Sequence, residues 1–566
     1  MPGLLAFAVA ALSHGAEPAT PDPAPTSGRP LLRIIVTDSL EAANTFVPAP
    51  EAEFVVLSPG LAAFNAADLN TRLASGLNRI IDERLLAAIA QVIETFLRQN
   101  NHPNATVVIP TQSIAEGVVR VIAQPGPDTA TVVSQAKSTN WKIRNINIPQ
   151  TRWFSESLLR QKLRIEQGGL VRFDELDRAI DWTNNNSFRR IRVRIDPVPN
   201  TDEADLTIAM QEALPLRLSL TLDNAGNAVL GQHRFILAAT YANLWGLDHQ
   251  LSYQYITTET PNIYQGHGLD YRVPLPWRHY FQISGTYLKA KPEIYDGLFL
   301  QEGETITTDL RYTMPVRTGI NPIDLFASIG FKETNNNLTW DPRASKLLVQ
   351  SSKTNIFQFT LGGSAVRRDK LGAWALGASA TFSPGDVNSR NRAAAFGETR
   401  PGADPRYVYG SVSLQRLINL KGGWDLSSRL MVQASDDNLL PSEQLSIGGG
   451  ASVRGYPENL YAGDQAFVFV TELISPALKR SIPRLSKTLG PLETRGLIFY
   501  DAANSEAKTP ARFDPVRRPL ASAGLGVRMA LATNFSLQAD YGWRLASLPY
   551  QEIPGSRGHI RVSIAY

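Results

Sequence analysis

The feature that most constrains this chain is a two-residue alternation of apolar and polar side chains. It recurs in segment after segment from about residue 214 to the C-terminus. In one such segment Leu251, Tyr253 and Tyr255 interleave with Ser252 and Gln254. Because successive side chains of a strand point to opposite faces, the pattern predicts many strands with one apolar and one polar face.

Several of these segments have Tyr or Trp near their ends and Gln, Asp or Arg on the polar face. Near the C-terminus Tyr541 and Trp543 alternate with Asp540 and Arg544. Such strands suit a membrane β-barrel with lipid outside and water inside, and the alternative is a soluble β-sandwich or propeller with one wet face. At roughly 22 residues per strand and connection, residues 214–566 predict an antiparallel barrel of about 16 strands.

The composition alone resembles that of a soluble protein, with 43% hydrophobic residues and a mean hydropathy of −0.15. No apolar run reaches the roughly 20 residues of a membrane-spanning helix, but a barrel passes this test because every second residue faces water. The absence of cysteine excludes disulfides, thiolate metal sites and a cysteine nucleophile. A net charge of +4 over 566 residues argues against a chain-wide nucleic-acid-binding tail, although it excludes no local basic patch, and we expect no nucleic-acid partner.

The N-terminal segment has the pattern of a secretory signal. The apolar run Leu4–Leu12 is followed by small residues, which predicts a signal peptide over residues 1–16, with a buried terminal helix as the alternative. Residues 17–30 are rich in proline and predict a disordered linker.

Two α+β modules are expected between this linker and the barrel, over residues 31–126 and 127–213. In the first, strand patterns at 31–36, 54–57, 106–109 and 118–122 flank an amphipathic helix around 85–97. In the second, two amphipathic helices precede alternating strands that include Ile191, Val193 and Ile195. The chain is therefore expected to comprise two similar modules and one barrel.

Enzyme motifs are missing from the sequence. The seven histidines are scattered without metal-ligand spacing, which favours girdle or turn positions for them. Neither a Walker A sequence nor a G-x-S-x-G motif with triad partners is present. We therefore expect no enzyme activity, no cofactor and no metal.

The densest local signal is a glycine-rich segment over residues 445–465. A glycine run ending at Gly450 is followed by Val453-Arg454-Gly455-Tyr456, which suits a constrained loop whose backbone passes close to another element. An arginine held between glycines inside a polar lumen needs an anion, and its fork favours a carboxylate.

The candidate anion is Asp501, in a downstream strand. Asp501 and Phe499 lie on the face opposite Ile498 and Tyr500, so the carboxylate can point into the lumen.

These residues resemble the motifs of the two-partner secretion transporters, the B components of the outer-membrane barrel-assembly superfamily. Val453–Tyr456 resembles the family's V-R-G-Y loop, and Phe499-x-Asp501 resembles its F-x-D strand. Further stretches along the chain also resemble the family: Ile109–Gln112 with Gly117 resembles a POTRA (polypeptide-transport-associated) segment, and similar likenesses occur at Asp223–Asn227, Tyr271–Leu275 and Leu440–Gln444.

The resemblance implies an outer-membrane protein of a Gram-negative bacterium, with two POTRA modules in the periplasm. It implies that the modules receive an unfolded secreted exoprotein, an adhesin-like or haemolysin-like A component, which leaves through the pore of the barrel. It assigns Arg454 to pair with Asp501. It also implies contact with lipid and, during biogenesis, with the barrel assembly machinery, through a C-terminal strand bearing Ile560, Val562, Ile564 and Tyr566.

Two positions depart from the family pattern. Residues 17–30 are too rich in proline for the plug helix of many members, and Ala503 stands where the family usually has glycine. Three alternatives stay open: an insertase of the same superfamily, a passive porin and a surface enzyme built on a barrel.

Overall fold

The computed structural model describes residues 30–46, 53–62, 64–79, 81, 83–100, 106–110, 112, 117–124, 141–198, 201–227, 229–294, 298–319, 321–340, 347–482, 490–510, 517–546 and 554–566. The predicted signal peptide and nearly all of the predicted linker lie outside these residues. Among the helices described, none is long and apolar enough to cross a membrane.

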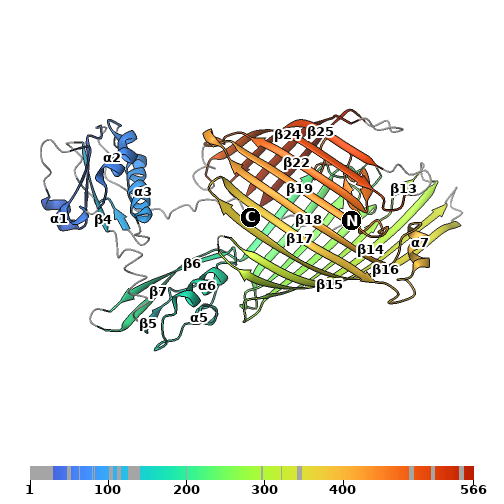
Figure 1. Cartoon of the computed structure of the whole chain (residues 1–566), viewed down its shortest axis with the longest axis horizontal. Coiled ribbons are helices and arrows are strands. Elements are labelled where there is room, and N and C mark those ends of the chain that lie inside the picture. The colour runs from blue at the N-terminus through green and yellow to red at the C-terminus, as the bar shows by residue number, and fades with distance from the viewer. Residues whose placement is uncertain are drawn as a thin grey trace.

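The first module is a four-stranded sheet with helices packed on it (Figure 1). The strand order is β2-β1-β4-β3, with β1 parallel to β2 and β4 and with β3 antiparallel to β4. The long helix has buried Leu85, Ile89, Ile93 and Phe96 on one face, as helical spacing requires. The elements are β1 (Arg33–Thr37), α1 (Leu40–Thr45), β2 (Val55–Leu57), α2 (Ala66–Leu73), α3 (Glu83–Gln99), β3 (Thr106–Val108) and β4 (Val118–Gln124).

The second module is a three-stranded sheet with order β5-β7-β6 and two helices. Ser155 caps the first helix by accepting the Leu158 N–H, and Arg164 ends it in a left-handed conformation with φ +55°. The elements are β5 (Lys142–Asn147), α5 (Glu156–Leu163), α6 (Phe173–Thr183), β6 (Arg189–Pro197) and β7 (Glu203–Glu212). The predicted α+β modules are confirmed as a fold class, and their boundaries stay predictions.

The rest of the chain closes into an antiparallel barrel (Figure 1). In the described residues sixteen strands form its wall, and β13 (Glu293–Ile294) and β23 (Leu478–Arg480) are short segments beside β14 and β24. The wall strands are β8 (Leu216–Asp223), β9 (Arg234–Leu244), β10 (His249–Thr258), β11 (Tyr264–Pro274), β12 (Tyr280–Ala290), β14 (Phe299–Arg317), β15 (Ile323–Trp340), β16 (Leu347–Asp369), β17 (Gly372–Pro384), β18 (Arg406–Asn419), β19 (Asp425–Ser435), β22 (Gln465–Ile474), β24 (Leu492–Glu506), β25 (Arg518–Leu531), β26 (Phe535–Arg544) and β27 (Ser556–Ala565).

The wall strands place alternate side chains on opposite faces. On β24, Ile498 and Tyr500 are 53% and 43% exposed on the outside, whereas Phe499 and Asp501 are buried on the inside at 5% and 0%. The barrel closes because β27 pairs with β8 through five residue pairs from Arg561 to Ala565. Closure leaves no unpaired sheet edge in the wall, which confirms the predicted barrel of about 16 strands.

An ion cluster joins the second module to the turn between β9 and β10. Arg189 donates from both Nη atoms to the Asp248 carboxylate, at 2.6 and 2.8 Å, and Lys162 Nζ lies 2.6 Å from the same carboxylate. All three side chains are at most 10% exposed. Burial opposes ionisation of Asp248, but its hydrogen bonds and the charges of Arg189 and Lys162 outweigh that effect and lower its pKa. Beside these charges the rings of Trp182 and Tyr280 pack together, with 4.6 Å between their centroids.

We expect Asp248→Ala to loosen the second module from the barrel. The change leaves two buried cations without their anion, which costs about 3–5 kcal/mol and raises the undocked fraction by roughly 100-fold or more. The variant Ala242→Cys reports undocking, because Ala242 is only 3% exposed beside this ion cluster and the chain has no other cysteine. Its labelling rate should rise in Asp248→Ala. It should stay unchanged in Asp369→Ala, which removes a carboxylate paired with Arg416 in another turn. Equal rates in the two variants would contradict the role given to Asp248.

Candidate functional site

Residues 436–464 connect β19 to β22 and form a loop, here named the signature loop. Its stem is a small hairpin of β20 (Leu445–Ile447) and β21 (Tyr461–Gly463). Val453 and Tyr456 near its tip are 0% exposed and form one apolar cluster with wall residues that include Ala503 and Leu520. The tip therefore lies inside the barrel against its wall.

Glycine is required where the tip meets the wall. Gly455 has φ +86°, and a Cβ on it would lie 2.8 Å from the carbonyl oxygen of Gly542 on β26. A Cβ on Gly542 would in turn lie 2.7 Å from the Gly455 nitrogen. The two backbones are in direct contact, so no side chain fits at either position.

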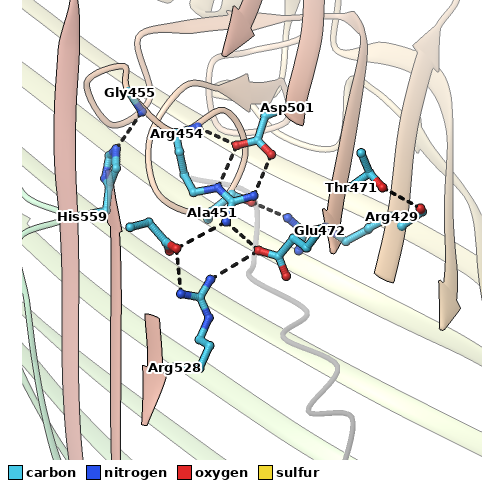
Figure 2. A network of polar contacts seen from close by, with 11 residues as sticks. Arg429, Ala451, Arg454, Gly455, Thr471, Glu472, Asp501, Arg528 and His559 are labelled. Carbon is cyan, nitrogen blue, oxygen red and sulfur yellow. Dashed lines mark hydrogen bonds and ion pairs between the residues drawn. The ribbon is translucent and has the colours of Figure 1, made fainter. Parts of the chain in front are cut away.

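Arg454 is the centre of the contacts between the tip and the wall (Figure 2). Its Nε and Nη2 atoms donate to the two oxygens of Asp501, each at 2.8 Å, and its backbone N–H donates to the same carboxylate at 3.0 Å. Both side chains are almost fully buried. This bidentate, charge-assisted geometry is the strong form of an arginine–carboxylate pair.

Two further carboxylates surround the same guanidinium. Glu472 of β22 accepts from Arg454 Nη1 at 2.5 Å, and Asp540 of β26 lies 3.6 Å from that nitrogen. Arg528 of β25 bonds both of these carboxylates, at 3.3 Å to Glu472 and 2.7 Å to Asp540. The loop arginine therefore enters a network built from four wall strands in succession.

The wall is shaped around this network. Arg454 Cζ lies 3.5 Å from the centroid of the Phe499 ring, a cation–π contact. On β25, a Cβ on Gly524 would lie 2.3 Å from the Phe499 ring, and one on Gly526 would lie 2.0 Å from the Asp540 carboxylate. The two glycines leave the space that the aromatic ring and the carboxylate occupy.

The tip also contacts strands near the closing edge of the barrel. The Gly455 N–H donates to Nε2 of His559 on β27 at 3.1 Å (Figure 2). His559 is 6% exposed, and its Nδ1 lies 3.4 Å from a carboxylate oxygen of Glu458 in the loop. The Tyr456 hydroxyl donates to the Ala521 carbonyl of β25 at 2.9 Å.

The stem of the loop has a separate set of polar contacts. Asp464, at the end of the loop, pairs with both Nη atoms of Arg400 and accepts from Gln444 and from the Leu439 N–H. Arg400 follows α7 (Ala393–Thr399) in the connection between β17 and β18. Glu443 pairs with Lys332 of β15. Stem and tip are thus held by different residues.

The structure brings together several residues that the sequence singled out. Arg454, Phe499 and Asp501 are in mutual contact, Val453 and Tyr456 anchor the tip, and a Cβ on Gly450 would lie 3.2 Å from His559. The four residues singled out on the C-terminal strand face away from this cluster, on the side of β27 opposite His559: Ile560, Ile564 and Tyr566 are exposed on the outside, and Val562, on the same face, is half-buried. The methyl of Ala503 fits into the apolar cluster beside the tip.

Sequence reasoning missed four participants, Glu472, Arg528, Asp540 and His559. Each is a charged or polar residue on the inward face of a wall strand, and that position was the available signal. The interpretation of lone histidines as girdle or turn residues is wrong for His559, because it is buried and hydrogen-bonded to the loop. Within the described residues, no group of three His, Cys, Asp or Glu side chains is arranged to hold a metal ion.

Comparison with protein families shows which family this chain belongs to. The family model "Haemolysin secretion/activation protein ShlB/FhaC/HecB" matches residues 202–529, more than half of the chain. The chain belongs to this family. Its relatives include the "Heme/hemopexin transporter protein HuxB" of Haemophilus influenzae, which is 20% identical over 425 residues, covering 74% of this chain and 69% of the relative.

Solved structures support the same fold. CdiB from Escherichia coli superposes with a TM-score of 0.62 at 15% identity, over 98% of this chain and 93% of that chain. BamA from Haemophilus ducreyi lacking POTRA domains 1–3 superposes with a TM-score of 0.52 at 13% identity, over 95% and 100% of the two chains. The protein is an outer-membrane secretion component with periplasmic POTRA modules, and it passes a partner protein through its barrel pore.

We expect the Arg454–Asp501 contact to couple two mutations. Arg454→Ala leaves three wall carboxylates facing two arginines, Arg528 and Arg429, and Asp501→Ala leaves a buried guanidinium short of its bidentate partner. Each single variant should lower the free energy of unfolding. The two single losses should sum to more than the loss in the double variant, and the difference is a coupling of about 1.5–7 kcal/mol for a close buried pair.

The measurement is a double-mutant cycle on the full-length protein, with unfolding followed by loss of heat-modifiable migration and secretion followed in parallel. The exposed pair Arg406–Asp386 is the matched control, with an expected coupling below about 1 kcal/mol. Strictly additive losses for Arg454 and Asp501 would refute direct coupling between them.

Proposed function

We propose that the protein exports an unfolded secreted exoprotein through the lumen now occupied by the signature loop. The observation that carries the proposal is the loop itself, which is held in the lumen by ion pairs and hydrogen bonds to the wall and by no covalent link. Such contacts are exchangeable where water reaches them, and Glu472 and Arg528 are 19% and 24% exposed. Withdrawal of the tip would open a polar path for an extended chain.

The POTRA modules would receive the partner through the edges of their sheets. The first sheet ends in β2 and β3, and the second ends in β5 and β6. An extended segment can add to such an edge by main-chain hydrogen bonds with little dependence on its sequence. This mode suits a partner that arrives unfolded.

The partner would be a large exoprotein of the adhesin or haemolysin kind, made as the cognate A component. The relative HuxB is named a heme/hemopexin transporter protein, so transport is the role named for a protein that is 20% identical to this chain. We propose transport without catalysis, cofactor or nucleotide, with folding of the partner outside the cell supplying the direction of movement.

The outer face of the barrel would contact lipid. The final strand presents Ile560, Ile564 and Tyr566 outward, at 52%, 55% and 78% exposure. We propose that this apolar, aromatic-ended strand is also what the barrel assembly machinery receives during biogenesis.

A second candidate is an outer-membrane insertase, favoured by the structural likeness to BamA. Such a protein would assemble other barrels and would not release a soluble product. The two functions therefore differ in the final location of the client, which is the membrane for an insertase and the space beyond the membrane for a secretion pore.

The test is a reconstitution of the full-length protein in lipid vesicles, with an unfolded A-component exoprotein from a neighbouring reading frame added on the POTRA side. We expect the exoprotein to become protected from protease inside the vesicle without ATP. A requirement for ATP would contradict the proposed energy source. A client that ends embedded in the bilayer would instead favour the insertase.

A further inference from the structure

We propose that the wall site around Arg454 is a guanidinium receptor, and that it takes arginine side chains of the partner once the loop tip withdraws. The site, here named the cage, consists of Asp501, Glu472, Asp540 and Phe499. The inference rests on the proposed export function, since it names the chemistry that the pore offers to the chain in transit.

The cage matches the shape of a guanidinium. Asp501 binds Nε and Nη2 side by side, Glu472 binds Nη1 at 2.5 Å, and the Phe499 ring covers the planar face at 3.5 Å. These contacts use three nitrogens in one plane and the flat face of the group. An ammonium is a compact point charge and cannot make them together, so the cage favours arginine over lysine.

The cage belongs to the wall, whereas the guanidinium in it belongs to the loop. The cage residues come from three wall strands: Glu472 from β22, Phe499 and Asp501 from β24, and Asp540 from β26. Between them, Gly524 and Gly526 of β25 leave room for Phe499 and Asp540. Arg528 holds Glu472 and Asp540 in place through contacts that do not involve the loop. Withdrawal of the tip would therefore empty a site that stays assembled.

An empty cage would carry excess negative charge. The three carboxylates would face Arg528 and, from β19, Arg429, whose present hydrogen bond is to the Ala451 carbonyl of the loop (Figure 2). Asp501 would lose its bidentate partner while buried at 0% exposure. A buried carboxylate without a partner is strongly unfavourable, so a second guanidinium would be drawn into the site.

Exchange of one guanidinium for another would lower the free energy needed to release the loop. An extended partner that offers an arginine at the cage would replace the contacts that Arg454 gives up. The pore would then favour arginine in passing segments while remaining indifferent to the rest of their sequence.

The first experiment measures binding to the cage in the Arg454→Ala variant of the full-length protein. The probes are N-methylguanidinium and methylammonium at equal ionic strength, far below unfolding concentrations. We expect methylguanidinium to raise the unfolding temperature by roughly 1–2 °C at tenfold above half-saturation, and methylammonium to have little effect. The wild type should not respond, because Arg454 fills the site.

Two further variants make the result decisive. Arg454→Ala combined with Glu472→Gln and Asp501→Asn neutralises the cage and should abolish the response. Heat-modifiable migration checks that each variant is folded. Equal stabilisation by both cations, or a response that survives neutralisation of the cage, would overturn the proposal because it would indicate general charge screening.

The second experiment asks whether an external arginine displaces the loop. A single thiol at Ser452, which is 9% exposed beside Arg454, reports release of the tip. In vesicles containing this otherwise wild-type protein, an unstructured peptide with one arginine should speed labelling, and the same peptide with citrulline should not. Equal rates would refute exchange. Export of the exoprotein with no arginine effect would leave the proposed function standing, and an arginine effect without export would leave only the receptor.

Discussion

The arrangement of the pore depends on where one guanidinium sits. Arg454 is carried by a loop whose backbone touches β26 at Gly455 and Gly542, and its charge is placed among three carboxylates of the wall. An arginine cannot lose its charge in a protein, so once it is inside the barrel it must find anions there. The loop path, the glycines of β25 and the bonds of Arg528 all follow from meeting that requirement.

Much of the fold could be predicted from the sequence because two local periodicities dominate it, the helical spacing and the two-residue alternation of strands. The helix Glu83–Gln99 follows from apolar residues at helical spacing, and strand β24 follows from the alternation of Ile498 and Tyr500 with Phe499 and Asp501. The same alternation explains the low hydropathy, since half of each wall strand faces inward. These are properties of neighbouring residues, so no knowledge of distant contacts was needed.

The remainder of the site depends on register between strands that are far apart in sequence. Arg454 contacts Glu472, 18 residues away, and Gly455 contacts His559, 104 residues away. Local alternation places His559 on the inward face of its strand, but its partner is chosen by how β27 lines up beside β26. The junction between Arg189 and Asp248 is beyond local patterns for the same reason, since it needs the module and the barrel to be placed together.

The two ion clusters of the molecule differ in the property that matters for transport. At the junction, Lys162, Arg189 and Asp248 are all nearly dry, so separating them leaves bare charges with nothing to replace their partners. At the cage, Glu472 and Arg528 are in contact with the lumen, where water or another cation can take over as Arg454 leaves. Charge pairs of the same chemical kind would thus fix the module and, in the proposed export, release the loop. The two clusters differ in their outer members, because the central Arg454–Asp501 pair is as buried as the junction and only Glu472 and Arg528 are partly exposed.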